Sequence, residues 1–289
     1  AQHYIDVQME GFKRIGVLGD WEHPYKTMDP GFEAREVRVF GQMYKNGHIY
    51  KGLKPVYWCP HDETALAEAE IEYSDETSPS IFVRFEMPSK PAGLENFDGP
   101  VDFIIWTTTP WTIPSDQAVS LKPGAAYVAV EHDGRAEVML EDLAPKCCEE
   151  FGWEYTPVMV DGKPYVVPAE TFHHIHYKQP IFDGVEGVAL LADYVGVDDG
   201  TGIVHNSPGH GVDDYFACLK EGITDICMPV DDDGKFYTGE EFGTGGPFSG
   251  MDTDEANPHI IEFLRERGTL VLEKKITHSY PHCWRCKHP

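Results

Sequence analysis

Two segments of the chain carry side chains that could bind a charged substrate and position a water molecule. Residues 106–114 read W-T-T-T-P-W-T-I-P, and the proline after the threonines prevents a β-ladder from continuing. Residues 200–215 read G-T-G-I-V-H-N-S-P-G-H-G-V-D-D-Y, with a histidine after a β-branched stretch and two acids at the expected start of a helix. Hydroxyls, an imidazole and a carboxylate together predict a polar pocket able to hold an ammonium group and a water, without an obvious nucleophile.

Each of these residue types also has a structural explanation. Threonine is common in strands, but three in a row place side chains on both faces, so at least one hydroxyl points inward and indicates a polar purpose. Asp213 and Asp214 both suit a helix N-terminus, where acids complement the dipole; we expect Asp213 to do so and Asp214 to remain free for a ligand. His210 either packs within its Gly/Pro loop or contacts the site, and the sequence leaves both interpretations open.

Cysteines near both ends of the chain predict a metal site. Cys283 and Cys286 form a Cys-x-x-Cys knuckle in which two thiolates face one tetrahedral ion, and Cys59 adds a third sulfur. The candidates for the fourth ligand are Asp62, favoured by its spacing from Cys59, His61, favoured by zinc chemistry, and His282. We expect a structural zinc, because a thiolate-rich closed site leaves no open position; the alternative is a degenerate site held by hydrogen bonds and packing.

A run of histidines at His173, His174 and His176 is a weaker metal candidate. On a strand, His174 and His176 would share one face. No third ligand lies near them in the sequence, so we expect ordinary surface histidines.

The composition is strongly acidic. The 289 residues include 23 Lys and Arg against 49 Asp and Glu, a formal net charge of −26, which opposes non-specific binding to a polyanion. Lys274-Lys275 and residues 285–287 are the candidate basic strips. No stretch of eighteen apolar residues and no secretion signal occur, so we expect a cytoplasmic protein.

Hydrophobic periodicity predicts a mainly β fold with flanking helices. Helices are expected over 33–46, 213–221 and 258–267, the last with Pro258 near its first turn. Short β-rich runs punctuated by Gly, Pro and Asp favour a closed or partly closed barrel over parallel βαβ units. These runs are residues 80–86, 101–106, 126–131, 137–140, 165–167 and 187–191.

Four segments resemble bacterial-type isoleucyl-tRNA synthetase, and the resemblance covers nearly the whole chain. They are the two site segments, the run W-C-P leading to T-A-L-A-E-A-E over residues 58–70, and the ending H-S-Y-P-H-C-W-R-C. More narrowly, the chain resembles the connective insertion that hydrolyses mischarged valyl-tRNA. The resemblance implies an editing-domain β-barrel at 71–276, a zinc-binding neck at 57–70 and 277–289, and a helical segment at 1–56 that leads out of the catalytic domain. It also implies tRNA(Ile) carrying valine at its 3′ end and the remainder of the synthetase as partners, and an isolated fragment that is monomeric.

The resemblance further assigns roles to the site residues. The catalytic set that it implies is Thr107, Thr108, Thr109, His205 and Asp214, and the substrate-binding set is Thr112, Asp116, Gly202 and His210. Asp116 departs from the pattern, because the family commonly has Asn there, and its acceptor-only anion puts the efficiency of editing in doubt. A degenerate editing domain that serves as a tRNA-binding or structural module is therefore the alternative. The H-I-G-H and K-M-S-K-S elements that hold ATP in the family do not occur, so we expect neither ATP binding nor aminoacylation from this chain.

Overall fold

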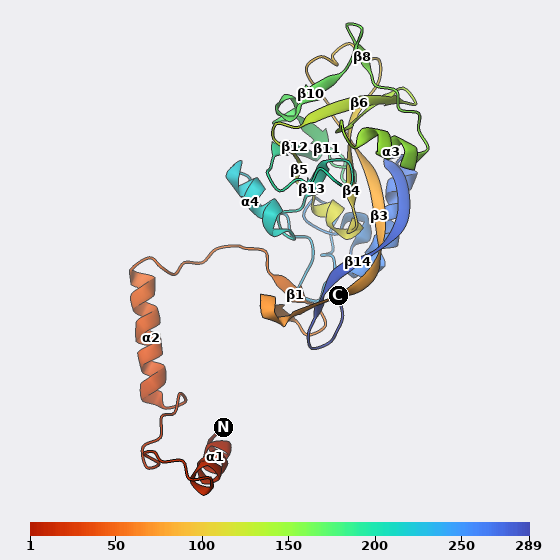
Figure 1. Cartoon of the computed structure of the whole chain (residues 1–289). Helices are drawn as coiled ribbons and strands as arrows, with labels where there is room; N and C mark the ends of the chain where they lie inside the picture. Colours follow the sequence, from red (N-terminus) through yellow and green to blue (C-terminus); the bar gives the residue numbers. More distant parts are fainter. The chain divides into compact units, whose positions relative to one another are not determined.

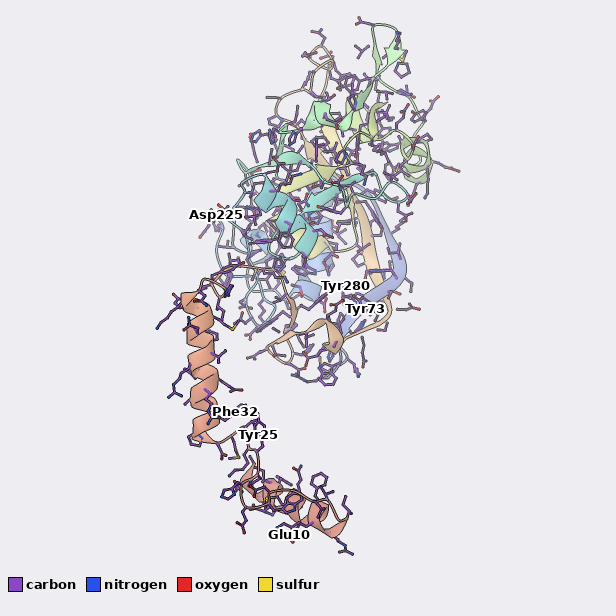
Figure 2. All side chains as sticks on the ribbon, turned by 60° about the vertical axis from the view of Figure 1, so that its left-hand side comes forward. Glu10, Tyr25, Phe32, Tyr73, Asp225 and Tyr280 are labelled. Carbon is purple, nitrogen blue, oxygen red and sulfur yellow. The ribbon has the colours of Figure 1, made fainter.

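The computed structural model describes residues 1–289 and divides them into two compact units, 1–53 and 54–289. The first unit contains helices α1 (Gln2–Arg14) and α2 (Pro30–Lys45), and neither has a buried residue. Figure 2 shows the rings of Tyr25 and Phe32 together in this unit, where they meet edge to face at 5.4 Å. The apolar residues of α2 are thus exposed, and α2 confirms the predicted helix.

The second unit is built around two mixed β-sheets. The six-stranded sheet has the order β10-β6-β7-β4-β3-β14, and the four-stranded sheet has the order β11-β12-β5-β13. The strands of the first sheet are β10 (Val166–Pro168), β6 (Ala126–His132), β7 (Arg135–Leu140), β4 (Val101–Thr107), β3 (Ile71–Glu86) and β14 (Leu270–Cys283). Those of the second are β11 (His176–Lys178), β12 (Glu186–Leu191), β5 (Ala118–Leu121) and β13 (Ile203–Asn206). All six predicted strands are confirmed within a residue or two, apart from the N-terminal extension of β3.

The longest element is the antiparallel ribbon of β3 and β14, which lie side by side in Figure 1. Its register runs from Leu270 opposite Val83 to Cys283 opposite Ile71. Tyr73 and Tyr280 lie along this ribbon (Figure 2). The ribbon ends next to the hairpin of β1 (Tyr57–Cys59) and β2 (Thr64–Leu66), so chain segments far apart in sequence meet there.

The mainly β fold with flanking helices is confirmed. Of the two forms expected, a closed or a partly closed barrel, full closure is wrong, since both large sheets are open. Closure of the larger sheet would require its edge strands to pair, but the three-residue β10 pairs only with β6, and β14 pairs only with β3. Parallel neighbours are also present, between β4 and β7 and between β5 and β12. The core lies between the layers and is dominated by apolar side chains of β3, β4, β6 and β7.

Three helices complete this unit: α3 (Ala144–Phe151), α4 (Val212–Lys220) and α5 (Thr253–Glu266). Helix α4 confirms its prediction, and Gly268, in the left-handed region at φ 71°, follows the end of α5 as expected. Helix α5 starts earlier than predicted, because the Asp252 side chain caps it by accepting from the Glu255 backbone N–H at 2.7 Å. Pro258 therefore lies inside the helix and not in its first turn. No helix combines the length and the apolar character that crossing a membrane requires.

Short irregular elements finish the fold. They are the 3-10 helices η1 (Glu68–Glu70), η2 (Pro110–Ser115), η3 (Ala169–Phe172) and η4 (Gly246–Phe248), and the two-residue strands β8 (Met159–Val160) and β9 (Lys163–Pro164). Strands β4 and β13, one from each large sheet, are in contact. The end of β4, with η2 after it, is thereby brought against β13.

Candidate functional site

The threonine run lies where β4 ends. Thr107 is the last residue of the strand and is buried, whereas Thr108 and Thr109 are half-buried. The Thr107 hydroxyl accepts from the Thr109 backbone N–H at 3.0 Å, which turns the chain out of the ladder. Pro110 then begins η2, as expected from its missing N–H.

Thr112 and His205 form the centre of the cluster. Thr112 lies in η2, and its hydroxyl donates to the Thr109 carbonyl oxygen at 2.8 Å. The same hydroxyl oxygen lies 3.0 Å from Nε2 of His205, which β13 presents from the other sheet. Both side chains are buried, so residues 93 positions apart share one hydrogen-bonded contact.

Asp116 holds the other side of the His205 ring. Its Oδ2 lies 3.2 Å from His205 Nδ1, and its Oδ1 accepts a hydrogen bond from the Tyr177 hydroxyl. Burial raises the pKa of the Asp116 carboxyl to about 6, against the opposing effects of His205 and Tyr177. The charge of Asp214 contributes least to this shift, so repulsion between the Asp116 and Asp214 carboxylates is minor.

The hydrogen bonds among Thr112, His205 and Asp116 can be protonated in two ways. The Thr112 hydroxyl has one proton and faces two acceptors, the Thr109 carbonyl and His205 Nε2. If Thr112 donates this proton to the Thr109 carbonyl, His205 Nε2–H must donate to the Thr112 oxygen. A second proton is then needed for the hydrogen bond between His205 Nδ1 and Asp116 Oδ2. Without that second proton, the ring carries its proton on Nδ1, which donates to the Asp116 carboxylate. His205 Nε2 then accepts from the Thr112 hydroxyl. The protonation of Asp116 is thus coupled to the orientation of the Thr112 hydroxyl.

Asp214 is fixed by three donors. Its Oδ1 accepts from Asn206 Nδ2 at 3.0 Å and from the Tyr194 hydroxyl at 3.2 Å, and its Oδ2 accepts from the Ser207 backbone N–H at 3.0 Å. Burial raises the pKa of the Asp214 carboxyl, whereas the charge of His205 lowers it. Asp213, its neighbour on α4, is exposed. Asp214 is therefore the acid that is oriented toward the interior, with lone pairs left for a cation.

Two glycines and a histidine support the cluster. A Cβ at Gly211 would lie 2.4 Å from Asp214 Oδ2, so only glycine fits there. Gly202 has φ 72°, a Cβ there would lie 2.4 Å from Cβ of Leu140, and its carbonyl oxygen accepts from the Tyr127 hydroxyl at 2.6 Å, so the observed contacts of Gly202 are with the core. His210 packs edge-on against Trp111 at 4.7 Å, and burial lowers the pKa of its imidazole to about 4.

Sequence reasoning missed three members of this network: Tyr177, Tyr194 and Asn206. Asn206 could have been suspected, because it directly follows His205 on the same strand. Its side-chain Oδ1 accepts from Ser120 Oγ at 2.7 Å. The two tyrosines have no sequence signal, since each reaches the site from an element with no site motif of its own.

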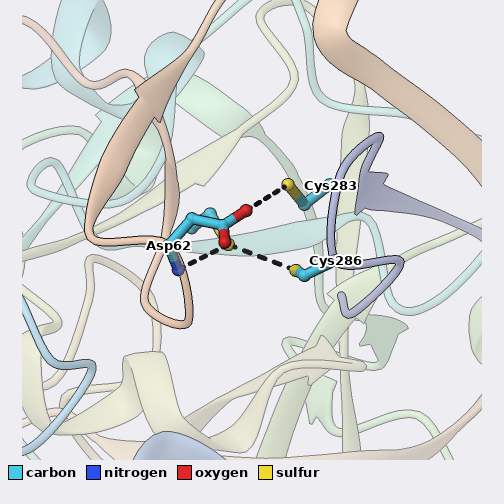
Figure 3. A group of neighbouring side chains, drawn as sticks. Asp62, Cys283 and Cys286 are labelled. Atoms are coloured by element: carbon cyan, nitrogen blue, oxygen red, sulfur yellow. Dashed lines mark hydrogen bonds between the residues drawn. The ribbon is translucent and has the colours of Figure 1, made fainter.

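A second cluster lies at the base of the β3 and β14 ribbon. Ligand atoms of Cys59, Asp62, Cys283 and Cys286 all lie within 4.8 Å of one another. Figure 3 shows Asp62, Cys283 and Cys286 pointing toward one another. The Sγ atoms of Cys59 and Cys286 are 3.5 Å apart, and Cys283 Sγ is 3.4 Å from Asp62 Oδ2. Tetrahedral bonds of about 2.3 Å to sulfur require sulfur atoms roughly 3.8 Å apart, so three thiols and one carboxylate fit a single ion.

The other two candidates for the fourth ligand have different partners. The His61 ring stacks on His288 with centroids 3.8 Å apart, and His282 Nδ1 lies 2.9 Å from Ser74 Oγ. The structure thus brings Asp62, not these histidines, to the three sulfur atoms.

The candidate basic strips are largely neutralised by acidic partners. Lys274 pairs with Glu150, and Lys287 lies 2.6 Å from Glu72. Arg285 lies 3.6 Å from Glu70. Each of these three cations is therefore paired with an acid, whereas Lys275 of the first strip is exposed.

The architecture is similar to that of solved editing domains. The crystal structure of GlLeuRS-CP1 aligns with a TM-score of 0.51 at 14% identity, covering 68% of this chain and 99% of that one. The editing domain of P. knowlesi cytosolic leucyl-tRNA synthetase aligns at 10% identity with a TM-score of 0.49, covering 72% of this chain and 98% of that domain. The chain has the fold of a class I synthetase CP1 editing domain.

The family follows from the sequence. Residues 1–278 match the family of tRNA synthetases class I (I, L, M and V), and the chain belongs to that family. It is 45% identical over 291 residues to "Isoleucine--tRNA ligase" of Nitratidesulfovibrio vulgaris (strain DSM 19637 / Miyazaki F) and 46% identical over 289 residues to that of Enterococcus faecalis (strain ATCC 700802 / V583). Each match covers 100% of this chain but 30% of the relative, so the chain spans under a third of the relatives' length.

Proposed function

We propose that this chain is the editing part of an isoleucyl-tRNA synthetase and hydrolyses the ester bond of valyl-tRNA(Ile). The observation that carries the proposal is the contact of Thr112 with His205 beside the fixed carboxylate of Asp214. Residues 71–276 would form the editing domain, and residues 57–70 and 277–289 its neck.

The reaction needs little covalent chemistry from the protein. An aminoacyl ester is already activated, so water adds to the carbonyl carbon, the bond to the ribose oxygen breaks, and that oxygen takes up a proton. Asp214 holds the α-ammonium group of valine, because its carboxylate is oriented by three donors. Thr107, Thr108, Thr109 and His205 orient the water and the ester, and orientation supplies much of the rate.

Thr112 is proposed to set the size limit for the amino acid. Its hydroxyl is held between Thr109 and His205, so its methyl group has a fixed position. Asp116, Gly202 and His210 would complete the substrate-binding set behind Thr112 and His205. His205 is kept in register by Asp116, which in turn is held by Tyr177.

Zinc is proposed for the cluster of Cys59, Asp62, Cys283 and Cys286. The soft thiolate donors favour zinc, and four protein ligands leave no position for substrate, so the ion would be structural. It would join the hairpin of β1 and β2 to the end of β14 and so stabilise the neck.

The partners proposed are the aminoacylated 3′ end of tRNA(Ile) and the remainder of the synthetase. Helix α2 has exposed apolar side chains, such as Val37 and Phe40, which need a covering surface. The remainder of the synthetase would provide it. With a net charge of −26, this chain alone would bind tRNA weakly, and the assay is best run at low salt.

Deacylation of valyl-tRNA(Ile) by the chain tests the proposal. We expect hydrolysis of this substrate and none of isoleucyl-tRNA(Ile), and we expect His205→Ala and Asp214→Ala each to lower the rate by about 100-fold. Asp213→Asn, at the exposed neighbouring acid, is the matched control and should keep the wild-type rate. A folded Asp214→Ala protein with full activity would show that the assignment is wrong. Binding of the charged tRNA end without hydrolysis by the wild type would favour the degenerate module instead.

A further inference from the structure

Two adjacent histidines converge with an acid at the end of helix α4, away from the threonine cluster. His174 Nε2 lies 3.1 Å from Glu221 Oε2, and His173 Nε2 lies 3.7 Å from the same oxygen. Glu221 is the residue that caps the C-terminal end of α4, whereas the histidines lie between η3 and β11. The third ligand that the sequence lacked nearby thus comes from a different element.

The backbone is built to present both rings on one side. In an extended chain the side chains of adjacent residues point to opposite faces. His174 instead has φ 64°, in the left-handed region, and its backbone N–H donates to the Ala189 carbonyl oxygen at 2.8 Å. The two rings therefore lie 3.8 Å apart, tilted by 32°.

One nitrogen of this group has no other partner. His173 Nε2 is buried and makes no hydrogen bond, which costs free energy unless a further group satisfies it. The next histidine, His176, has a separate partner, with Nδ1 3.5 Å from Glu186 Oε2. Of the three neighbouring histidines, only His173 therefore has a buried nitrogen without a hydrogen bond, whereas His174 and His176 each face a carboxylate.

We propose that His173, His174 and Glu221 bind a divalent transition-metal ion of the zinc type. Two imidazoles and one carboxylate are borderline donors suited to such ions, and bond lengths of about 2.0 to 2.2 Å place tetrahedral ligand atoms roughly 3.3 Å apart. The observed separations of 3.1 and 3.7 Å lie on either side of that value. Three protein ligands leave at least one position for water, in contrast to the closed cysteine cluster.

Such an ion would join the C-terminal end of α4 to the turn before β11. Helix α4 carries Asp214 in its first turn, so the ion would brace the element that holds the proposed ammonium ligand. The site itself does not depend on the proposed editing activity. Its metal affinity falls at acid pH, because both imidazoles must be neutral to bind.

Metal titration of the whole chain, with the cysteine cluster already loaded with zinc, tests this proposal. Isothermal titration with Zn²⁺ should show a second equivalent, and long-range ¹H–¹⁵N spectra should show shifts of the His173 and His174 ring nitrogens. His174→Asn, which tolerates the left-handed backbone, and Glu221→Gln should each weaken the second equivalent by at least about tenfold.

His176→Gln is the matched control and should bind both equivalents as the wild type does. Cys283→Ser should keep the histidine site while losing the cysteine site, which separates the two ions. If the wild-type protein binds no zinc beyond the ion already at the cysteine cluster, the proposal is overturned. Equal weakening in His176→Gln would do the same, since the ion would then be bound by surface histidines in general.

Discussion

Replacement of Asp116 by Asn tests whether a buried acid beside His205 makes the stability of this chain depend on pH. Asp116 is completely buried, and its pKa is about 6 in the folded protein against an ordinary value of 3.8. The folded chain therefore keeps this proton over a range in which the unfolded chain releases it. The stability that Asp116 contributes is fully present below pH 3.8 and is lost as the pH rises through about 6.

The size of the effect follows from the two pKa values. At about 1.36 kcal/mol per pH unit, the difference between about 6 and 3.8 corresponds to about 3 kcal/mol of unfolding free energy. Asn occupies the same volume, accepts from Tyr177 and donates to His205 Nδ1, but it does not titrate. Relative to the wild type, Asp116→Asn should therefore gain about 3 kcal/mol between pH 4 and pH 7.

Urea unfolding followed by tryptophan fluorescence at several pH values measures this difference. His210 also titrates in this range, since its pKa is lowered to about 4, but it is present in both proteins and its contribution cancels. Asp213→Asn, which removes the charge of an exposed acid, is the matched control. A stability difference between Asp116→Asn and wild type that stays constant from pH 4 to pH 7 would refute the reasoning. The same pair of proteins, compared in the deacylation assay, shows whether the acid lowers editing efficiency.

Three further outcomes are expected. Freshly purified protein should retain one tightly bound zinc at the cysteine cluster by elemental analysis, and Cys283→Ser should lose it; unchelated wild type without metal would contradict the site. Thr112→Ala should allow hydrolysis of isoleucyl-tRNA(Ile). Thr112→Val keeps the volume but not the hydroxyl, so it should lower the rate of deacylation and still discriminate valine from isoleucine. One methylene is worth about 1–3 kcal/mol, a magnitude already known for synthetases of this kind. Gly202→Ala should lower the unfolding free energy by about 3 kcal/mol, because it combines a left-handed φ with a clash against Leu140. Gly124→Ala, with the same φ of 72° and open space, should lower it by about 1 kcal/mol. Equal losses in the two variants would show that the clash is relieved.

The sequence by itself determined the local elements and the family. Alternating and β-branched runs predicted the strands, because their side-chain pattern is set by backbone geometry within a few residues. The cysteine knuckle, the threonine run and the Gly-Thr-Gly segment identified both clusters, since each places its donors close together along the chain. The sequence left a closed and a partly closed barrel open, because closure depends on whether the two edge strands meet, which no local pattern encodes.

Only the tertiary structure decided which distant side chains complete each site. Tyr177 reaches Asp116 across 61 positions, and Cys283 reaches Asp62 across 221, through strand registers that the sequence does not display. The choice of Asp62 over His61 was likewise open until the fold stacked His61 on His288. Glu221 joins the two histidines for the same reason, because the end of α4 is packed beside the turn before β11. Contacts of this kind depend on the packing of whole elements, so residue spacing alone cannot specify them.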